Sequence, residues 1–126
     1  MRFFPQARIH AFEPSKVHYE ILMKKISEFN NITANNVGLG SRIEDRILYK
    51  DQDVTGLASL TQRDLDHIGK SFEKTESVQI VTLDDYLSDQ EIPCTDLLKL
   101  DIEGHELDAL NGAINTIKHR KITLIQ

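Results

Sequence analysis

Two stretches of the chain alternate short apolar segments with helical patterns, and this alternation constrains the fold more than any other feature. Residues 8–12 and 32–37 are predicted strands, and residues 15–29 between them carry apolar side chains at helical spacing. A third strand is predicted at 97–102, a helix follows it, and a last strand occupies 122–126. Strands that alternate with helices form parallel sheets with helices on their faces, so we expect an α/β fold. The strongly apolar run at 97–102 is typical of a strand buried on both faces.

Composition excludes several classes of protein. With 126 residues, of which 40% are hydrophobic and 28% charged, the chain is expected to form one globular domain. Its net charge of −5 argues against a general nucleic-acid binder. The single cysteine, Cys94, cannot form an internal disulfide, and no apolar run approaches the ~18 residues of a membrane span. We therefore expect a cytoplasmic domain that binds neither nucleic acid nor membrane.

A long polar segment separates the two alternating units. Short strands are predicted at 47–49 and 78–81, and residues 50–77 between them form a polar insert. A connection of this length inside a compact domain is usually functional or mobile. Two interpretations stay open: the insert recognises a substrate, or it is a disordered surface loop.

The first candidate site lies where the first two predicted strands end, because ligands of open α/β sheets bind outside the carboxyl ends of the strands. Glu13 directly follows the first strand, and a carboxylate there can accept hydrogen bonds from the cis-diol of a ribose. The alternative is an acid that stabilises the start of the following helix. Asn36 and Val37 end the second strand, where they either meet a purine edge or form a plain turn.

The second candidate site follows the apolar strand at 97–102. Asp101, Glu103, His105 and Glu106 form a dense ionisable cluster, and a helix is predicted from there to His119. The cluster can supply a general base, hydrogen-bond acceptors, or ligands for a divalent cation. The alternative is that the acids cap the following helix around the turn at Gly104.

Five segments in this order closely resemble the FkbM family of S-adenosylmethionine-dependent methyltransferases. The resemblance covers nearly the whole chain, and the first and fourth of these segments are the most specific. They are AFEPS at 11–15, NVGLG at 36–40, VTLDDYL at 81–87, LKLDIEGHE at 98–106 and LNGA at 110–113.

The resemblance implies a Rossmann-like class I methyltransferase fold and the cofactor S-adenosylmethionine. It also implies methyl transfer to a hydroxyl group of a sugar or natural-product-like acceptor. By the same resemblance Glu13 holds the cofactor ribose, Asn36 and Val37 lie at the adenine, and Asp101 lies where the methionine end of the cofactor meets the acceptor. Any base that deprotonates the acceptor is expected in the same cluster, and the catalytic candidates are Asp101, Glu103 and His105.

The sequence also departs from the family pattern. A family member is expected to carry a glycine-rich strand and loop before the Phe-Glu-Pro segment and further strands after the last one, and residues 1–126 contain neither. We therefore expect one partial methyltransferase domain whose sheet is incomplete at both ends, with weak cofactor binding and no activity as this chain. Alternatives are a non-catalytic α/β interaction module, including a homodimer formed by strand exchange, and a divalent-metal-dependent enzyme that uses the cluster at 101–106.

Overall fold

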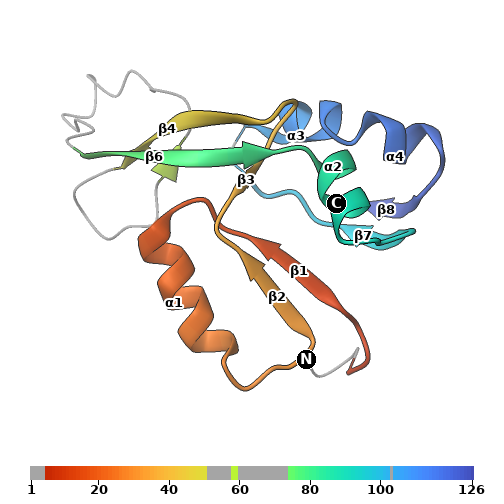
Figure 1. Ribbon diagram of the computed structural model, residues 1–126, viewed down its shortest axis with the longest axis horizontal. Coiled ribbons are helices and arrows are strands. Elements are labelled where there is room, and N and C mark those ends of the chain that lie inside the picture. Colours follow the sequence, from red (N-terminus) through yellow and green to blue (C-terminus); the bar gives the residue numbers. More distant parts are fainter. Residues whose placement is uncertain (1–4, 51–57, 60–73, 103) are drawn as a thin grey trace.

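The computed structural model describes residues 5–50, 58–59, 74–102 and 104–126, which form an α/β arrangement (Figure 1). The elements in chain order are β1 (Ile9–Phe12), α1 (Lys16–Ile26), β2 (Ile32–Asn35), β3 (Gly38–Leu39), β4 (Glu44–Lys50), β5 (Ala58–Ser59), β6 (Lys74–Val81), α2 (Leu83–Asp89), β7 (Thr95–Leu98), α3 (Glu106–Asn111), α4 (Ile114–Lys118) and β8 (Ile122–Ile125).

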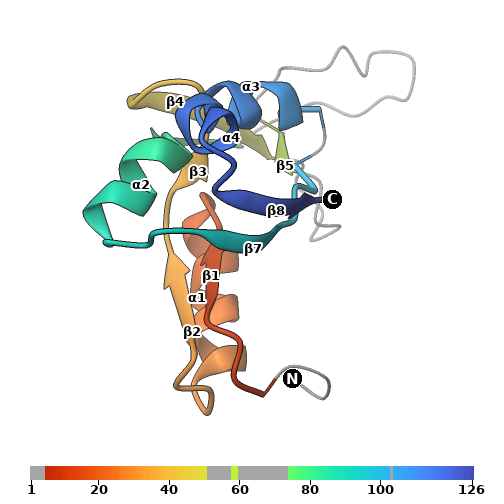
Figure 2. The same ribbon diagram turned by 90° about the vertical axis from the view of Figure 1, so that its right-hand side faces the viewer.

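The first predicted β-α-β unit is present. β1 and β2 are parallel, in a register that runs from Ile9 opposite Ile32 to Phe12 opposite Asn35, and α1 lies along them (Figures 1 and 2). The helix ends at Ile26, earlier than predicted, and the amide of Phe29 closes the next turn onto the carbonyl of Ile26 at 2.8 Å. No residue of α1 is fully buried, so its apolar side is only partly covered.

The second unit is present with a broken helix. β7 and β8 are parallel, as predicted, but the helix between them is divided into α3 and α4 at Gly112 and Ala113. Gly112 lies directly against the carbonyl group of Gly40, so a side chain has no room at this position. The core at this end of the molecule consists of Leu83, Leu87, Leu98 and Ala113.

The four-stranded sheet between the two units follows the order β3-β6-β4-β5. β4 and β6 are antiparallel and longer than the predicted strands at 47–49 and 78–81, and β3 joins β6 in parallel. Leu48, Val78 and Ile80 form its buried cluster. The rest of the predicted insert at 50–77 lies mainly outside the described residues.

Helix α2 connects the units by packing on β1. The Tyr86 ring meets the Phe12 ring edge to face at 4.7 Å, and its hydroxyl lies 2.7 Å from His10 Nδ1 and donates to Asn35 Oδ1 at 3.2 Å. Burial, with a smaller contribution from the charge of Arg8, lowers the pKa of His10, and burial raises that of Tyr86. Both groups are therefore neutral near pH 7, and they bond without an ion pair.

The prediction of an α/β fold with parallel strands is confirmed, but two details of it are wrong. The strand at 97–102 ends at Leu98 and is not buried on both faces, because Leu97 remains 50% exposed while Leu98 is buried. The parallel strands also form no single sheet: in the described part of the chain β1 pairs only with β2, and β7 only with β8.

Candidate functional site

Glu13 stands at the carboxyl end of β1, between that strand and α1. Its amide extends the ladder by donating to the carbonyl of Asn35 at 2.9 Å, and its own carboxylate Oε1 accepts from the amide of Ser15 at 2.9 Å. His18, on the first turn of α1, places Nδ1 4.0 Å from the same oxygen. The side chain of Glu13 is 30% exposed, so its carboxylate is held by the turn and still reaches solvent.

Asn36 is close to Glu13, but its side-chain amide serves the backbone. Its Nδ2 donates to the carbonyl of Glu13 at 2.9 Å and to that of Pro14 at 3.1 Å. Only Oδ1 of this side chain is left to meet an adenine, whose amino group is a donor. Val37 follows and is partly buried. The structure therefore brings Glu13 and Asn36 together, and the side-chain amide of Asn36 holds the turn after β1.

Glu76 also belongs to this region, although sequence reasoning missed it. From β6 its Oε1 accepts from the amide of Lys16, the first residue of α1, at 3.0 Å. The alternation of residues in β6 could have indicated this role, because Glu76 shares a face with the buried Val78 and Ile80. An acid on the buried face of a strand needs a hydrogen-bond partner.

The second candidate site is more dispersed than its sequence suggests. The Asp101 side chain is 81% exposed and pairs with Lys99 Nζ at 3.2 Å. His105 is the residue that precedes α3, where its side chain makes no capping bond to the helix. Glu103 lies outside the described residues.

Glu106 caps the turn that precedes α3. Its Oε1 accepts from the amide of Ile102 at 3.1 Å, and its Oε2 accepts from that of Gly104 at 3.0 Å. The turn needs a glycine, because Gly104 has a φ of 99°. Hydrogen bonds from its own amide and those of Gly104 and Ile102 lower the pKa of Glu106. This arrangement matches the capping interpretation for Glu106.

A metal centre has no support in the residues that the structure describes. Among them no three His, Cys, Asp or Glu side chains gather closely enough to hold an ion. Asp101 is directed to Lys99, and Glu106 to backbone amides.

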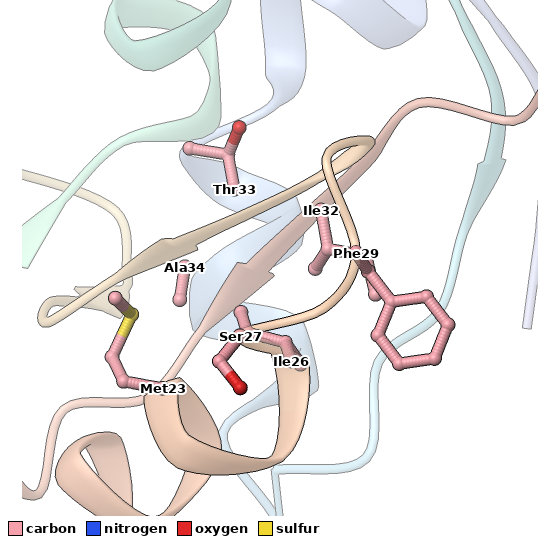
Figure 3. Close-up of a pocket in the computed structure, with 7 residues that line it drawn as sticks. All are labelled: Met23, Ile26, Ser27, Phe29, Ile32, Thr33 and Ala34. Carbon is pink, nitrogen blue, oxygen red and sulfur yellow. The ribbon is translucent and has the colours of Figure 1, made fainter.

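The cavity between α1 and β2 lies elsewhere. It has a volume of about 350 Å³, and the residues that line it are Met23, Ile26, Ser27, Phe29, Ile32, Thr33 and Ala34 (Figure 3). It adjoins the last turn of α1 and the start of β2, whereas Glu13 precedes the first turn of that helix. It is therefore distinct from the strand ends where an α/β sheet binds ligands.

In the described ranges no helix is long and apolar enough to cross a membrane.

Comparisons with known proteins show which family the chain belongs to. "Methyltransferase 1" of Beauveria bassiana (strain ARSEF 2860) is 28% identical, and the match covers 88% of this chain and 51% of the relative. The chain thus spans about half the length of this curated relative. The crystal structure of methyltransferase FkbM from Methylobacillus flagellatus KT has a similar fold, with a TM-score of 0.54 and 21% identity over 91% of this chain and 24% of that one. Residues 2–126 match the sequence model of the methyltransferase FkbM domain. The chain therefore belongs to the FkbM methyltransferase family.

Proposed function

We propose that the chain is part of an S-adenosylmethionine-dependent O-methyltransferase that acts on a hydroxyl group of a sugar or natural-product-like acceptor. The observation that carries the proposal is the Glu13 carboxylate at the carboxyl end of β1. Its Oε1 is occupied by the amide of Ser15, which leaves Oε2 to accept from a ribose hydroxyl. Asn36 Oδ1, beside it, can accept from the adenine amino group.

The chemistry requires alignment more than a strong base. S-adenosylmethionine, when bound, supplies a methyl group on a sulfonium. Glu13 and Asn36 would hold the nucleoside. Asp101 or His105 would receive the proton of the acceptor hydroxyl, whose oxygen would take the methyl group as the carbon–sulfur bond breaks and S-adenosylhomocysteine leaves. The exposed carboxylate of Asp101 is accessible for this role.

The 126-residue polypeptide by itself is expected to bind cofactor weakly and to be inactive. β1 and β7 precede the two candidate sites, and in the described part of the chain neither strand pairs with the other. The two sites are therefore held in one geometry by side-chain packing through α2, without a shared ladder of hydrogen bonds. A cytoplasmic location remains a prediction that rests on the single cysteine, Cys94.

Titration of the isotope-labelled chain with S-adenosylmethionine, followed by NMR, tests the proposal. We expect amide shifts at Glu13, Ser15 and Asn36 with weak affinity, and a loss of about tenfold or more in affinity for Glu13→Gln. Glu20→Gln, an exposed change on α1, is the matched control and should bind like the parent chain. Cofactor binding that is equally tight without the Glu13 carboxylate contradicts the proposed site, and micromolar binding by the parent chain contradicts the weak affinity.

A second candidate function is an interaction module that forms a homodimer by strand exchange. The specific observation is that β1 and β7 each have one partner strand within the described residues, so each presents a further edge.

A further inference from the structure

The turn that carries Glu13 is held from a distant part of the chain. Glu76 lies on β6, opposite Leu48 of β4, in the four-stranded sheet. Its Oε1 accepts from the backbone amide of Lys16, 60 positions earlier in the sequence. This bond joins the sheet between the two units to the first turn of α1.

The start of α1 needs such a partner. The first amides of a helix have no intrahelical acceptor, and together they attract negative charge. Ser15 is the residue that would ordinarily cap them, but its side chain makes no capping bond, and it is completely buried. The carboxylates that accept from this region are those of Glu76, which accepts from Lys16, and Glu13, which accepts from Ser15.

These two carboxylates accept from different amides at the start of α1. Because Glu76 satisfies the amide of Lys16, the Glu13 carboxylate is bound to the turn through Oε1 alone. If Glu76 were absent, the amide of Lys16 would lose this acceptor, and the Glu13 carboxylate, which already accepts from the neighbouring Ser15 amide, would be available to replace it. Its second oxygen would then be drawn toward the helix and away from a ligand.

We propose that Glu76 is a positioning residue for the nucleoside site: it caps α1 in place of Glu13 and so keeps the Glu13 carboxylate directed at the ribose. This inference rests on the proposed function, because it concerns the same carboxylate. Asn36 complements Glu76 from the other side by holding the carbonyl groups of Glu13 and Pro14. The turn is thereby fixed at both its carbonyl groups and its amide groups.

The test compares Glu76→Ala with Glu76→Gln, which keeps an acceptor oxygen. We expect Glu76→Ala to weaken S-adenosylmethionine binding about fivefold and to speed exchange of the Lys16 amide about tenfold, as loss of one charge-assisted hydrogen bond would. Glu76→Gln should restore both values to within about twofold. Gln79→Ala, an exposed change on the same strand, is the control and should alter neither.

A double-mutant cycle separates positioning from a purely structural role. If Glu76 acts through Glu13, then Glu76→Ala has no further effect on cofactor affinity once Glu13 is changed to Gln. Faster exchange at Lys16 with unchanged affinity would show that Glu76 is only a helix cap, and this overturns the inference while the proposed function stands. Additive losses in the cycle overturn it as well. A parent chain that binds no S-adenosylmethionine, or binds it independently of Glu13, removes the proposed function and the inference together.

Discussion

At the scale of single residues, two glycines let two distant motif segments come into backbone contact. Gly40 and Gly112 belong to the NVGLG and LNGA segments, and a Cβ on Gly112 would overlap the carbonyl group of Gly40. The φ of Gly112 is −76°, which any residue adopts, so the glycine is required for space and not for backbone conformation. The sequence indicated only that these segments occur in order, and the structure shows that two of them touch.

Gly112→Ala is expected to destabilise the protein by about 3 kcal/mol, because the clash is with backbone and no side-chain rotation relieves it. Urea unfolding at neutral pH measures the change in the free energy of unfolding. Asn111→Ala, at the exposed preceding position, is the control and should stay within about 0.5 kcal/mol of the parent chain. An equally stable Gly112→Ala would show that the two backbones do not meet as described.

At the scale of elements, helix α2 determines where α4 begins. The Asp84 carboxylate, on the first turn of α2, accepts from the amide of Asn115 at 2.9 Å and from that of Thr116 at 2.8 Å. It also accepts from the Thr116 hydroxyl at 2.6 Å, and Thr116 is buried. This external cap lets a new helix start two residues after the break at Gly112, which a periodic pattern alone does not reveal.

Because the Asp84 carboxylate caps α4, the free energy of unfolding is expected to fall at acid pH. Burial acts to raise the pKa of Asp84, but the hydrogen bonds from Thr116 and Asn115 outweigh it and hold that pKa below its ordinary value of 3.8. A carboxyl group with a depressed pKa in the folded state stabilises that state above its ordinary pKa, and the contribution is lost as the pH falls through the folded value. We therefore expect stability to decline below about pH 4, in part through this group.

Asp84→Asn tests the assignment. The substitution replaces one acceptor oxygen with a donor beside backbone amides, so it should cost about 1–3 kcal/mol at pH 7. The loss should shrink as the pH falls below 4. Urea unfolding across this range measures it, with Asp89→Asn, exposed at the end of the same helix, as the control. A cost that is the same at every pH would exclude the carboxylate charge as its source.

At the scale of the whole molecule, the parallel strands of the two β-α-β units form separate pairs. Within the described residues β1–β2 and β7–β8 are each a two-stranded parallel sheet. Apolar side chains of the second pair remain open to solvent, with Leu97 50% and Leu124 58% exposed. Parallel sheets are normally covered on both faces and contain more than two strands. The free edge of β7 in the described part of the chain therefore favours addition of another strand.

If a second copy supplies that strand, sedimentation equilibrium should show a concentration-dependent dimer. The amide of Thr95 donates to the carbonyl of Lys121 beside β8, so the alternation of a parallel ladder directs the amide of Asp96 to the other edge. Asp96→Pro removes that donor and should abolish the dimer, whereas Asp96→Ala should retain it. A chain that stays monomeric at all concentrations excludes strand exchange.

The sequence by itself determined the alternation of strands and helices in the two β-α-β units and the position of Glu13 after β1. These features depend on local periodicity, on turn residues and on the rule that ligand sites follow parallel strands, and all of these are visible within a few positions. The tertiary structure decided the rest. Glu76 accepts from the amide of Lys16, 60 positions away, and Gly112 lies against the carbonyl group of Gly40. Asp84 accepts from the amide of Thr116, 32 positions away, and so caps α4. Such contacts join groups that no local pattern links, because the partner of a backbone amide is set by the packing of whole elements and not by neighbouring residues.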